Sequence, residues 1–582
     1  MIVKTSKFDN AINSILVNLI PHSRKCKWSG INIHCENEFK IEDDDIKFLK
    51  LFQVLPPNFC PTCRRMRRLC HLNNSRLFVN KCNAPEHNEL IISILPKECP
   101  FPVYDYEYFI SDQFDPLSFG IDYDLNDSFM NQLFSLRKVF PMPSFLNRDP
   151  SSLNSEYSNG GRNLKNGYYV WGCYSTSDAW YCVYLNKCMN IMDSKVITDS
   201  EFVYESIFSN HLYKISFSYF SSNCIDCIFI FDCHNCQDCF GCVNLHNTRY
   251  CVFNEKLSKE KYEDFMNSIY PFTREKISIY KEKFWELVKR LPMNGSRNIS
   301  SLNVSGVNLK NSKNLFDVID ANHSENIRHS DSVINHNDSM DIMYSGGYSN
   351  LLYMDTNIGS HSSRVKFSVS SKFCTESEYI FNCKNCNNCF MCFGLQNKSY
   401  CILNKQYIKE EYFKIIDDIK FKMLQDGEYG DGVGLEFSVQ AYNFSIAQSV
   451  YPLDNETIIK VGGYIAKEPE SNVGNMEIIE YSNLSENIDL VSNDILTKAI
   501  ICKESGRPFR ITESELEFYK RMKLPLPDIH PSIRIEKRNF LVPDGKKYQS
   551  FCSKCNKNIE TVFNPVDGYN FYCEKCYKEE VL

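Results

Sequence analysis

Polar and apolar residues alternate with a fixed short period in the middle of this chain. From Leu212 the sequence can be written in blocks of twelve residues, LYKISFSYFSSN, CIDCIFIFDCHN and CQDCFGCVNLHN. Asn223, Asn235 and Asn247 close successive blocks. A short repeat with apolar alternation and Asn at the corners is typical of a β-solenoid, in which equivalent block positions stack from coil to coil. The pattern leaves open whether twelve residues make one small coil or half of a larger one.

The same pattern returns further along the chain. Blocks SSRVKFSVSSKF, CTESEYIFNCKN and CNNCFMCFGLQN run into KSYCILN, and looser Ser/Asn/Asp-rich blocks extend back to about residue 300. An amphipathic segment follows each copy, EKLSKEKYEDFMNSI after the first and KQYIKEEYFKIIDDI after the second. We expect each segment to be a helix that caps the open end of its solenoid.

Two CxxC motifs lie near the C-terminus. Cys552 and Cys555 form the first motif, and Cys573 and Cys576 form the second. The segment between them, NKNIETVFNPVDGYNFY, predicts a β-hairpin from its β-branched and aromatic residues and its Pro-Val-Asp-Gly turn. Two CxxC turns joined by strands bring four thiolates to the corners of a tetrahedron, about 2.3 Å from a zinc ion. The spacing therefore favours a structural zinc site over four free surface thiols.

The N-terminal region is a diverged copy of this module. A shift of 470 positions places FKIEDDDIKFLKLFQVLPPNFCPTCR (39–64) over FRITESELEFYKRMKLPLPDIHPSIR (509–534). The element IEDDDIKFLKLFQ has apolar residues at helical spacing and acidic residues in its first turn. It predicts a short capped helix that ends before Pro56 and Pro57.

The two copies keep different metal ligands. The N-terminal copy has Cys60 and Cys63 in one CxxC motif, preceded by Cys26 and Cys35, and these four cysteines are a second candidate zinc set. The alternative is a CxxC motif packed as ordinary residues. In the C-terminal copy His530 and Ile533 replace the first CxxC motif, so that a metal at that position is in doubt.

The central cysteines have several possible roles. Those in question are Cys233, Cys236, Cys239, Cys242, Cys383, Cys386, Cys389 and Cys392. The run superficially resembles a ferredoxin motif, but the x3-Cys-Pro ending is absent. Residues three apart in a strand point to opposite faces, so we expect four such sulfurs to converge only around tight corners. We favour cysteine as the filler of the solenoid core, with a zinc site and an iron–sulfur cluster as the alternatives.

An arginine cluster follows Cys63. Arg64, Arg65, Arg67 and Arg68 lie beside the zinc motif, where arginine is a common partner of a phosphate backbone. The alternative is a solvated helix face that pairs with the acidic run 42–45. The whole chain carries a formal charge of −7, which gives no global attraction to nucleic acid, so any such binding is local.

Composition narrows the class of protein. The chain has 582 residues, too many for one hydrophobic core, and 28 cysteines. The N-terminus is a poor signal peptide, and no stretch approaches the roughly 20 apolar residues of a membrane span. We therefore expect a cytoplasmic protein, neither secreted nor transmembrane, whose cysteines are reduced and serve as metal ligands or small buried residues.

The predicted fold is mainly β with short helices. Two Cys/Ser/Asn-rich β-solenoids, parallel β-helix-like and each capped by a helix, are flanked by zinc-ribbon-like modules at both termini. The expected boundaries are an N-terminal zinc module at 1–110, a connector at 111–155, the first solenoid at 156–254, a cap helix and linker at 255–295, the second solenoid at 296–404, a cap helix at 405–430, a connector at 431–498 and a C-terminal zinc-ribbon module at 499–582.

Several of these motifs occur together in a known group of proteins. SGRPFRITESELEFYKRMKLPLP, FCPTCRRMRRL, VYDYEYFISDQFDPLSFGIDYD, NCFGCVNLHNTRYCVFN and CSKCNKNIETVF…FYCEKCY cover nearly the whole chain. The sequence resembles an uncharacterised zinc-ribbon family of uncultured small-genome bacteria and giant, klosneuvirus-like viruses. The resemblance implies this architecture and zinc. Some viral members carry a CaiB/BaiF label, but we find no Rossmann-like βαβ pattern or glycine-rich nucleotide loop that would support CoA-transferase chemistry. Asp105 replaces a ribbon cysteine that the family pattern would place there.

These observations favour a non-enzymatic zinc-binding scaffold with about two structural zinc ions per chain and a rigid solenoid surface. The expected partner is another protein, and the resemblance places the chain in host cytoplasm or a virion if it is viral. The alternatives are a nucleic-acid-binding protein that uses Arg64, Arg65, Arg67 and Arg68, and an enzyme built on a β-helix or an iron–sulfur redox protein. The acidic loop SDQFDPLSFGIDYDLND is more typical of solvated turns and helix caps than of an active site.

Overall fold

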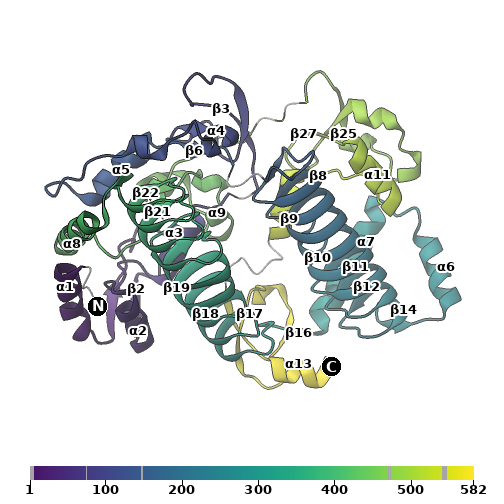
Figure 1. Cartoon of the computed structure of the whole chain (residues 1–582). Helices are drawn as coiled ribbons and strands as arrows, with labels where there is room; N and C mark the ends of the chain where they lie inside the picture. Colours follow the sequence, from purple (N-terminus) through teal and green to yellow (C-terminus); the bar gives the residue numbers. More distant parts are fainter. Residues whose placement is uncertain are drawn as a thin grey trace. The chain divides into compact units, whose positions relative to one another are not determined.

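The computed structural model describes residues 5–73, 75–145, 149–469, 471, 473–539 and 547–581. The chain is mainly β with short helices, and it divides into two compact units. Unit 1 comprises Met1–Ser144 and Arg297–Lys467, and unit 2 comprises Phe145–Ser296 and Glu468–Leu582. Each unit therefore combines one terminal module with one solenoid, and each module belongs with the solenoid that is more distant in the sequence (Figure 1).

The first solenoid, in unit 2, is a nine-stranded sheet in which each parallel strand pairs with the next one along the chain. Its strands are β7 (Ser158–Asn159), β8 (Arg162–Trp171), β9 (Tyr174–Met192), β10 (Lys195–Tyr204), β11 (Ile207–Tyr219), β12 (Ser222–Phe231), β13 (Gln237–Val243), β14 (Arg249–Val252) and the antiparallel β15 (Glu255–Lys256). Lys195 pairs with Ile207, and Ile225 pairs with Gln237. Partners twelve positions apart show that twelve residues make one complete coil.

The second solenoid, in unit 1, has the same construction. Its eight strands are β17 (Leu302–Lys310), β18 (Lys313–Asn322), β19 (Glu325–Thr356), β20 (Ser363–Lys366), β21 (Thr375–Phe381), β22 (Asn387–Phe393), β23 (Ser399–Ile402) and the antiparallel β24 (Lys405–Gln406). Most coils again have twelve residues, as in the pair Thr375 and Asn387. The pair Asn350 and Ser363 shows a coil with one additional residue.

The coils are narrow because the chain turns at every third residue. Consecutive corner residues have φ values of 51–61°, in the left-handed region, at His211, Lys214, Phe217, Phe220 and Asn223. One corner every three residues gives four corners in a coil of twelve. Asn and Asp tolerate this conformation well, which explains their frequency at the corners. Asn amides also form ladders between coils, as in the 3.0 Å hydrogen bond from Asn235 to Asn247.

One residue in every three points into the coil. Cys233, Cys236, Cys239 and Cys242 are three positions apart, and each has at most 1% of its surface exposed. Residues three apart in an uninterrupted strand would face opposite sides, but here a left-handed residue rotates the chain before the next inward position, so these sulfurs face one interior around tight corners.

Serine and cysteine share these inward positions because both satisfy the same backbone groups. The hydroxyl of Ser206 donates to Tyr204 O at 3.1 Å and accepts from Ser218 N, twelve residues later, at 3.1 Å. The thiol of Cys224 donates to Ser222 O at 3.3 Å in the same way. Ser206 and Cys224 are thus small enough for the interior, and their hydroxyl and thiol each have a hydrogen-bond partner.

The predicted cap helices are present. They are α6 (Lys259–Ile269) and α8 (Lys409–Gln425), and α7 (Arg274–Arg290) follows α6. Tyr250 in the last coil packs on Tyr262 of α6, with ring centroids 5.8 Å apart, and Tyr400 packs in the same way on Tyr412 of α8, at 5.6 Å. The antiparallel strands β15 and β24 pair with the last parallel strand of each solenoid, and they cover its edge before the helix begins.

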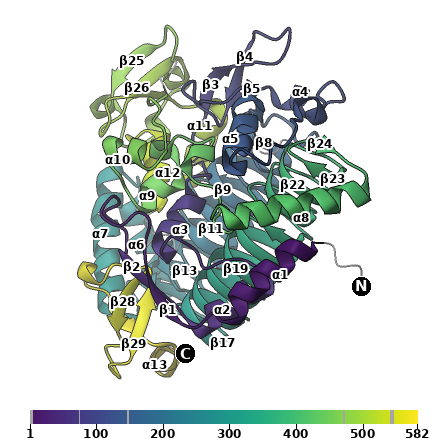
Figure 2. The ribbon, with the colours of Figure 1, turned by 90° about the vertical axis from the view of Figure 1, so that its left-hand side faces the viewer.

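Unit 1 contains the N-terminal module and the segments around its solenoid. Its remaining elements are α1 (Ser6–Val17), β1 (His22–Lys25), β2 (Glu38–Ile41), α2 (Asp43–Phe52), α3 (Pro61–Leu69), β3 (Phe78–Lys81), β4 (Leu90–Ser93), β5 (Val103–Tyr104), α4 (Tyr106–Ile110), α5 (Phe129–Val139), β6 (Met142–Pro143), α9 (Ile446–Val450) and α10 (Asn455–Lys460). Helices α2 and α3 pack on β19. Helix α1 lies against the cap helix α8, where Phe8 N donates to Asp417 Oδ1 at 2.8 Å (Figure 2).

Unit 2 contains the C-terminal module. Its remaining elements are β16 (Pro292–Asn294), β25 (Glu477–Glu480), β26 (Lys498–Ile501), β27 (Pro508–Arg510), α11 (Glu513–Met522), α12 (Pro531–Asn539), β28 (Tyr548–Phe551), β29 (Asn558–Thr561), β30 (Asn570–Tyr572) and α13 (Glu574–Val581). Among the helices of the described part of the chain, none is long and apolar enough to cross a membrane.

The two modules share local structure as the 470-residue shift predicts. Helix α2 begins with a capping box between Glu42 and Asp45, and α11 begins with a capping box between Thr512 and Glu515. Both helices end at a residue in the left-handed conformation, Gln53 with φ 52° and Lys523 with φ 52°. The predicted short capped helix over 41–53 is therefore present as α2.

Candidate metal centres

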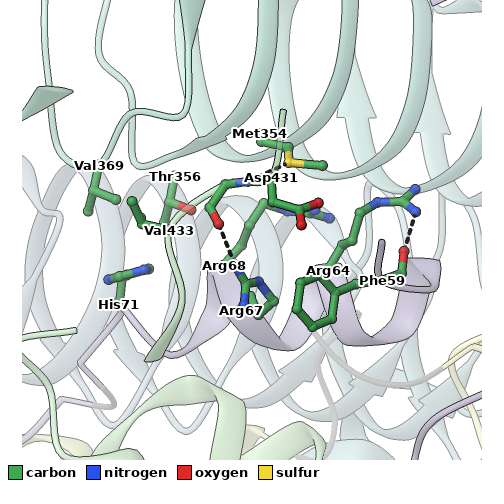
Figure 3. A pocket seen from close by; sticks show the side chains of 11 residues that line it. Phe59, Arg64, Arg67, Arg68, His71, Met354, Thr356, Val369, Asp431 and Val433 are labelled. Atoms are coloured by element: carbon green, nitrogen blue, oxygen red, sulfur yellow. Dashed lines mark hydrogen bonds between the residues drawn. The ribbon is translucent and has the colours of Figure 1, made fainter. Parts of the chain in front are cut away.

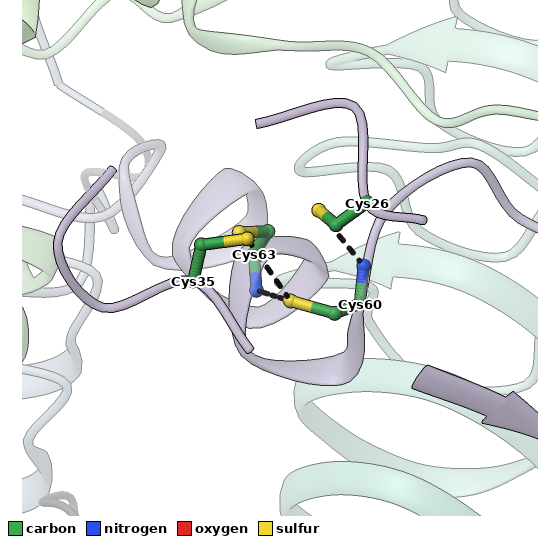
Figure 4. Close-up of side chains that lie close together, drawn as sticks. All are labelled: Cys26, Cys35, Cys60 and Cys63. Carbon is green, nitrogen blue, oxygen red and sulfur yellow. Dashed lines mark hydrogen bonds between the residues drawn. The ribbon is translucent and has the colours of Figure 1, made fainter. Parts of the chain in front are cut away.

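The N-terminal module brings four predicted ligands together. Cys26 follows β1, Cys35 lies in the loop before β2, and Cys60 and Cys63 form the first turn of α3 (Figure 4). The four sulfur atoms lie within 4.8 Å of one another, and those of Cys35 and Cys60 are 4.0 Å apart. All four ligands are thiols, as a closed tetrahedral zinc site requires. Cys26, Cys60 and Cys63 have at most 2% of their surfaces exposed, and Cys35 is partly exposed.

Backbone amides around this set favour sulfur in its charged form. Cys60 N donates to Cys26 Sγ at 3.3 Å, and Asn37 N donates to Cys35 Sγ at 3.3 Å. Hydrogen bonds from the Cys60 and Cys63 thiols lower the pKa of Cys26 to about 2, and the same contact with Cys26 raises the pKa of Cys60 to about 12. A negative charge on one sulfur thus opposes charge on the next. A divalent cation would remove this opposition and allow all four thiols to ionise.

The C-terminal module brings together the second predicted set. Cys552 and Cys555 follow β28, and Cys573 and Cys576 lie at the start of α13. Their ligand atoms lie within 4.8 Å of one another, and the sulfurs of Cys555 and Cys573 are 3.7 Å apart. Burial alone would raise the pKa of Cys552, but the backbone amides of Cys573 and Cys555 donate to its sulfur and lower that pKa to about 6. Four converging thiols again fit zinc.

The strands around this set differ from the prediction. The segment 556–572 was expected to form one hairpin, but β29 pairs with the preceding strand β28, with Tyr548 opposite Thr561. The second half of the segment, β30, instead pairs in parallel with β16, where Met293 lies opposite Phe571. The turn at 564–568 is present as a short 3-10 helix that ends at Gly568, with φ 81°. The hairpin prediction is wrong because the pairing partners come from outside the segment.

The lost motif of the C-terminal copy still has the backbone of a metal loop. His530 N donates to Cys502 Sγ at 3.2 Å, which is equivalent to the bond from Cys60 N to Cys26 Sγ. The His530 ring contacts the Arg507 guanidinium at 3.1 Å. The fold of the loop is thus retained, and a cation of the protein itself now lies beside His530.

The central cysteines line the interiors of the solenoids. Cys233, Cys236, Cys239 and Cys242 belong to the core of the first solenoid, and Cys383, Cys386, Cys389 and Cys392 belong to the core of the second. Their thiols donate to main-chain carbonyls, for example Cys242 to Phe240 O at 3.4 Å and Cys392 to Phe390 O at 3.2 Å. Among the described residues, none of these eight cysteines belongs to a candidate metal-binding group, that is, to a group whose ligand atoms lie within 4.8 Å of one another.

The predicted arginine patch is mostly buried. Arg64 and Arg68 are 4% and 5% exposed, and both pair with Asp341 of the second solenoid at 2.8 Å. Arg65 pairs with Asp331 at 2.9 Å. Arg67, which is partly exposed, stacks on the ring of Phe59 at 4.1 Å. The expected surface for a phosphate backbone is therefore not displayed, because these guanidinium groups serve contacts within unit 1.

The C-terminal copy repeats this contact, which the sequence analysis missed. Arg534 and Arg538 both pair with Asp193 of the first solenoid, Arg538 at 2.7 Å. Arg68 also donates to His329 O at 2.9 Å, and Arg538 donates to Tyr181 O at 3.0 Å. The sequence did contain a sign of the repeated contact. Arg64 and Arg68 align with Arg534 and Arg538 under the 470-residue shift, and a methionine directly precedes each aspartate. Their partners lie too far away in the sequence for a local pattern to identify.

A small cavity lies beside the first of these contacts. It has a volume of about 20 Å³, and Figure 3 shows Arg64, Arg68 and His71 around it. Burial, together with the charges of Arg67 and Arg137, lowers the pKa of His71 to about 3, so the ring is neutral. Among the described residues, His71 Nε2 and Arg68 Nε have no hydrogen-bond partner. The cavity has room for one water molecule.

Comparison with known proteins does not identify a family. No protein-family model matches the sequence, and no curated protein matches it. One similar solved structure is a “putative acetyltransferase” from Desulfovibrio desulfuricans G20, with 10% identity and a TM-score of 0.09. The match spans 39% of this chain and 64% of that one, and a TM-score this low carries no argument about fold or activity. The molecule is thus a cysteine-rich protein with two tetra-cysteine groups that could each hold a metal ion and with two long parallel sheets.

Proposed function

We propose that the protein is a non-enzymatic scaffold in which a structural zinc ion in each terminal module fixes that module to its solenoid. One observation carries the proposal. In both modules the residue directly after the last cysteine of the metal set contacts a buried aspartate of the solenoid. Arg64 follows Cys63 and pairs with Asp341, and Tyr577 follows Cys576 and donates to Asp232 Oδ2 at 2.7 Å.

The contacts explain why a metal would matter for assembly. A zinc ion fixes the backbone on both sides of each ligand, and therefore sets the position of the next side chain. Asp341 is fully buried, so its contact with Arg64 requires close geometry. Tyr577 contacts Asn244 as well as Asp232, at 3.1 Å. Loss of the metal would release these side chains together.

The closed ligand sets support a structural rather than a catalytic metal. Each set has four thiols, so a tetrahedral ion held by all four has no open position for water or substrate. The solenoid interiors are filled by buried side chains, and they offer a rigid framework rather than a ligand channel.

Unit 1 also has a surface suited to a protein partner, the class of partner that the sequence analysis expects. A groove of about 600 Å³ lies between α2 and the outside of the second solenoid. Leu51 and Phe316 line it with 51% and 42% of their surfaces exposed, and charged side chains of both signs surround them, Asp44, Lys47, Arg328 and Asp338. Exposed apolar residues surrounded by charge are typical of protein contact surfaces.

The proposal is tested by C555S, which removes the exposed ligand of the C-terminal set. We expect loss of one zinc ion per chain and loss of amide protection in α13, measured by hydrogen exchange, while β9–β12 keep their protection. Y577F should retain zinc and lose part of the protection of α13. K575A, on the exposed side of the same helix, is the matched control and should behave like the wild type. Unchanged zinc and unchanged α13 protection in C555S would refute the proposal.

A further inference from the structure

The N-terminal module contains a second ribbon in addition to its tetra-cysteine set. Strands β3 and β4 form a hairpin, with Phe78 opposite Ser93, and Cys82 follows β3 directly. In the C-terminal module β28 and β29 form the equivalent hairpin, and Cys552 follows β28 directly.

The hydrogen bonds show that the ribbon itself is intact. Cys82 N donates to Glu89 O at 3.1 Å, as Cys552 N donates to Lys557 O at 2.8 Å. The next residue continues the match, because Asn83 N donates to Val103 O and Ser553 N donates to Phe571 O, both at 2.8 Å.

The sulfur keeps its backbone donor as well. Asp105 N donates to Cys82 Sγ at 3.2 Å, and Asp105 follows β5 in the way that Cys573 follows β30. The amide of Cys573 donates to the sulfur of Cys552 in the same manner. Cys82 therefore lies in the environment of a zinc-binding thiolate, although its CxxC partner is missing.

Two residues that can bind zinc, His87 and Glu89, lie close to Cys82 in place of the missing CxxC cysteine. One atom each of Cys82, His87 and Glu89 lies within 4.8 Å of the other two. His87 Nδ1 and Glu89 Oε1 are 2.7 Å apart. Ligands about 2.0–2.3 Å from a tetrahedral zinc ion are roughly 3.3–3.8 Å from one another, so small side-chain rotations would complete the geometry. The aspartate at the fourth position does not take part, because its carboxylate accepts from Glu107 N at 3.1 Å and caps α4.

We propose that Cys82, His87 and Glu89 form a third zinc site, with the fourth coordination position open to water. Thiolate, imidazole and carboxylate are all zinc ligands, and three protein ligands with one open position distinguish this site from the two closed tetra-cysteine sets. The site is accessible, since Cys82 is buried but His87 and Glu89 reach the surface.

The test is equilibrium dialysis of the full-length protein against zinc, with bound metal counted for the wild type and for H87A. We expect H87A to bind one zinc ion fewer per chain. E86Q, an exposed change in the same loop, is the matched control and should bind as the wild type does. His87 is only partly buried, and equal thermal midpoints of the metal-free proteins would show that H87A is folded.

A second measurement uses cobalt in place of zinc. Cobalt bound by a mixed sulfur, nitrogen and oxygen set has a visible spectrum different from that of cobalt bound by four thiolates, and this difference should disappear in H87A. Equal zinc binding by H87A and the wild type would overturn the proposal. C35S and C555S distinguish the test of the third site from the test of the proposed function. Each variant should lose the zinc ion of its tetra-cysteine set whether or not the third site exists.

Discussion

At the scale of single residues, the interior of the second solenoid contains an unusual ionisable group. His336 is fully buried, and burial lowers its pKa to about 4. Ser345 Oγ donates to Ile358 O at 3.2 Å, so it accepts from His336 Nε2 at 2.9 Å. The ring is therefore neutral with the proton on Nε2. An inward position otherwise suited to serine or cysteine thus carries a group that charges in the unfolded chain near pH 6.5.

This histidine predicts an acid sensitivity. Between pH 6.5 and pH 4 the unfolded chain binds a proton at His336 that the folded chain does not bind, so stability falls as the pH falls through this range. The loss reaches about 3 kcal/mol at the lower end. Thermal midpoints of the wild type should decrease from pH 7 to pH 4.5 more steeply than those of H336N. The exposed H361N change is the control. Parallel curves for the wild type and H336N would contradict this account.

At the scale of elements, the arginine pairs on α3 and α12 determine how a module docks. Burial by itself would raise the pKa of Asp341, but the charges of Arg64 and Arg68 hold that pKa below its ordinary value. The carboxylate is thus ionised in the interior, and it is stable there only with both arginines present.

D341N is expected to destabilise unit 1 by about 3 kcal/mol, because it leaves two buried guanidinium groups without a compensating charge. Urea unfolding followed by a probe in unit 1 measures the effect. D112N, a change of the same kind at an exposed loop position, should alter the midpoint very little. A destabilisation no greater than that of D112N would show that the pair does not hold the module in place.

Sequence alone predicted the elements better than their contacts. The repeat of twelve was visible in the spacing of Asn235 and Asn247, but it did not show whether twelve residues make a whole coil or half of one, which only the strand pairing shows. The place of Cys236 and Cys239 in the core was predicted, but a left-handed corner at every third residue was not, since such corners at bulky residues such as Phe217 oppose ordinary backbone preferences. The four ligands of each metal set were predicted from spacing. The burial of Arg64 was not, because Asp341 lies 277 residues away.

At the scale of the whole molecule, the chain is built from two versions of one design. Each unit has a ribbon-type module, a coil of small inward residues and a pair of arginines on a buried solenoid aspartate. The metal sets have diverged between the versions, with the first CxxC kept at Cys60 and the later one kept at Cys552. Each unit thus keeps one group of four thiols, as the proposed role in assembly requires.

The most direct test of this account is the zinc and iron content of the purified protein and three variants, measured by mass spectrometry of the metals. C35S and C555S should each lose one zinc ion per chain. C239S should lose none, because Cys239 fills the solenoid core and a serine there can donate to the same carbonyl, Gln237 O. Loss of metal in C239S, or iron with sulfide in the wild type, would contradict the account and make the solenoid cysteines the metal site.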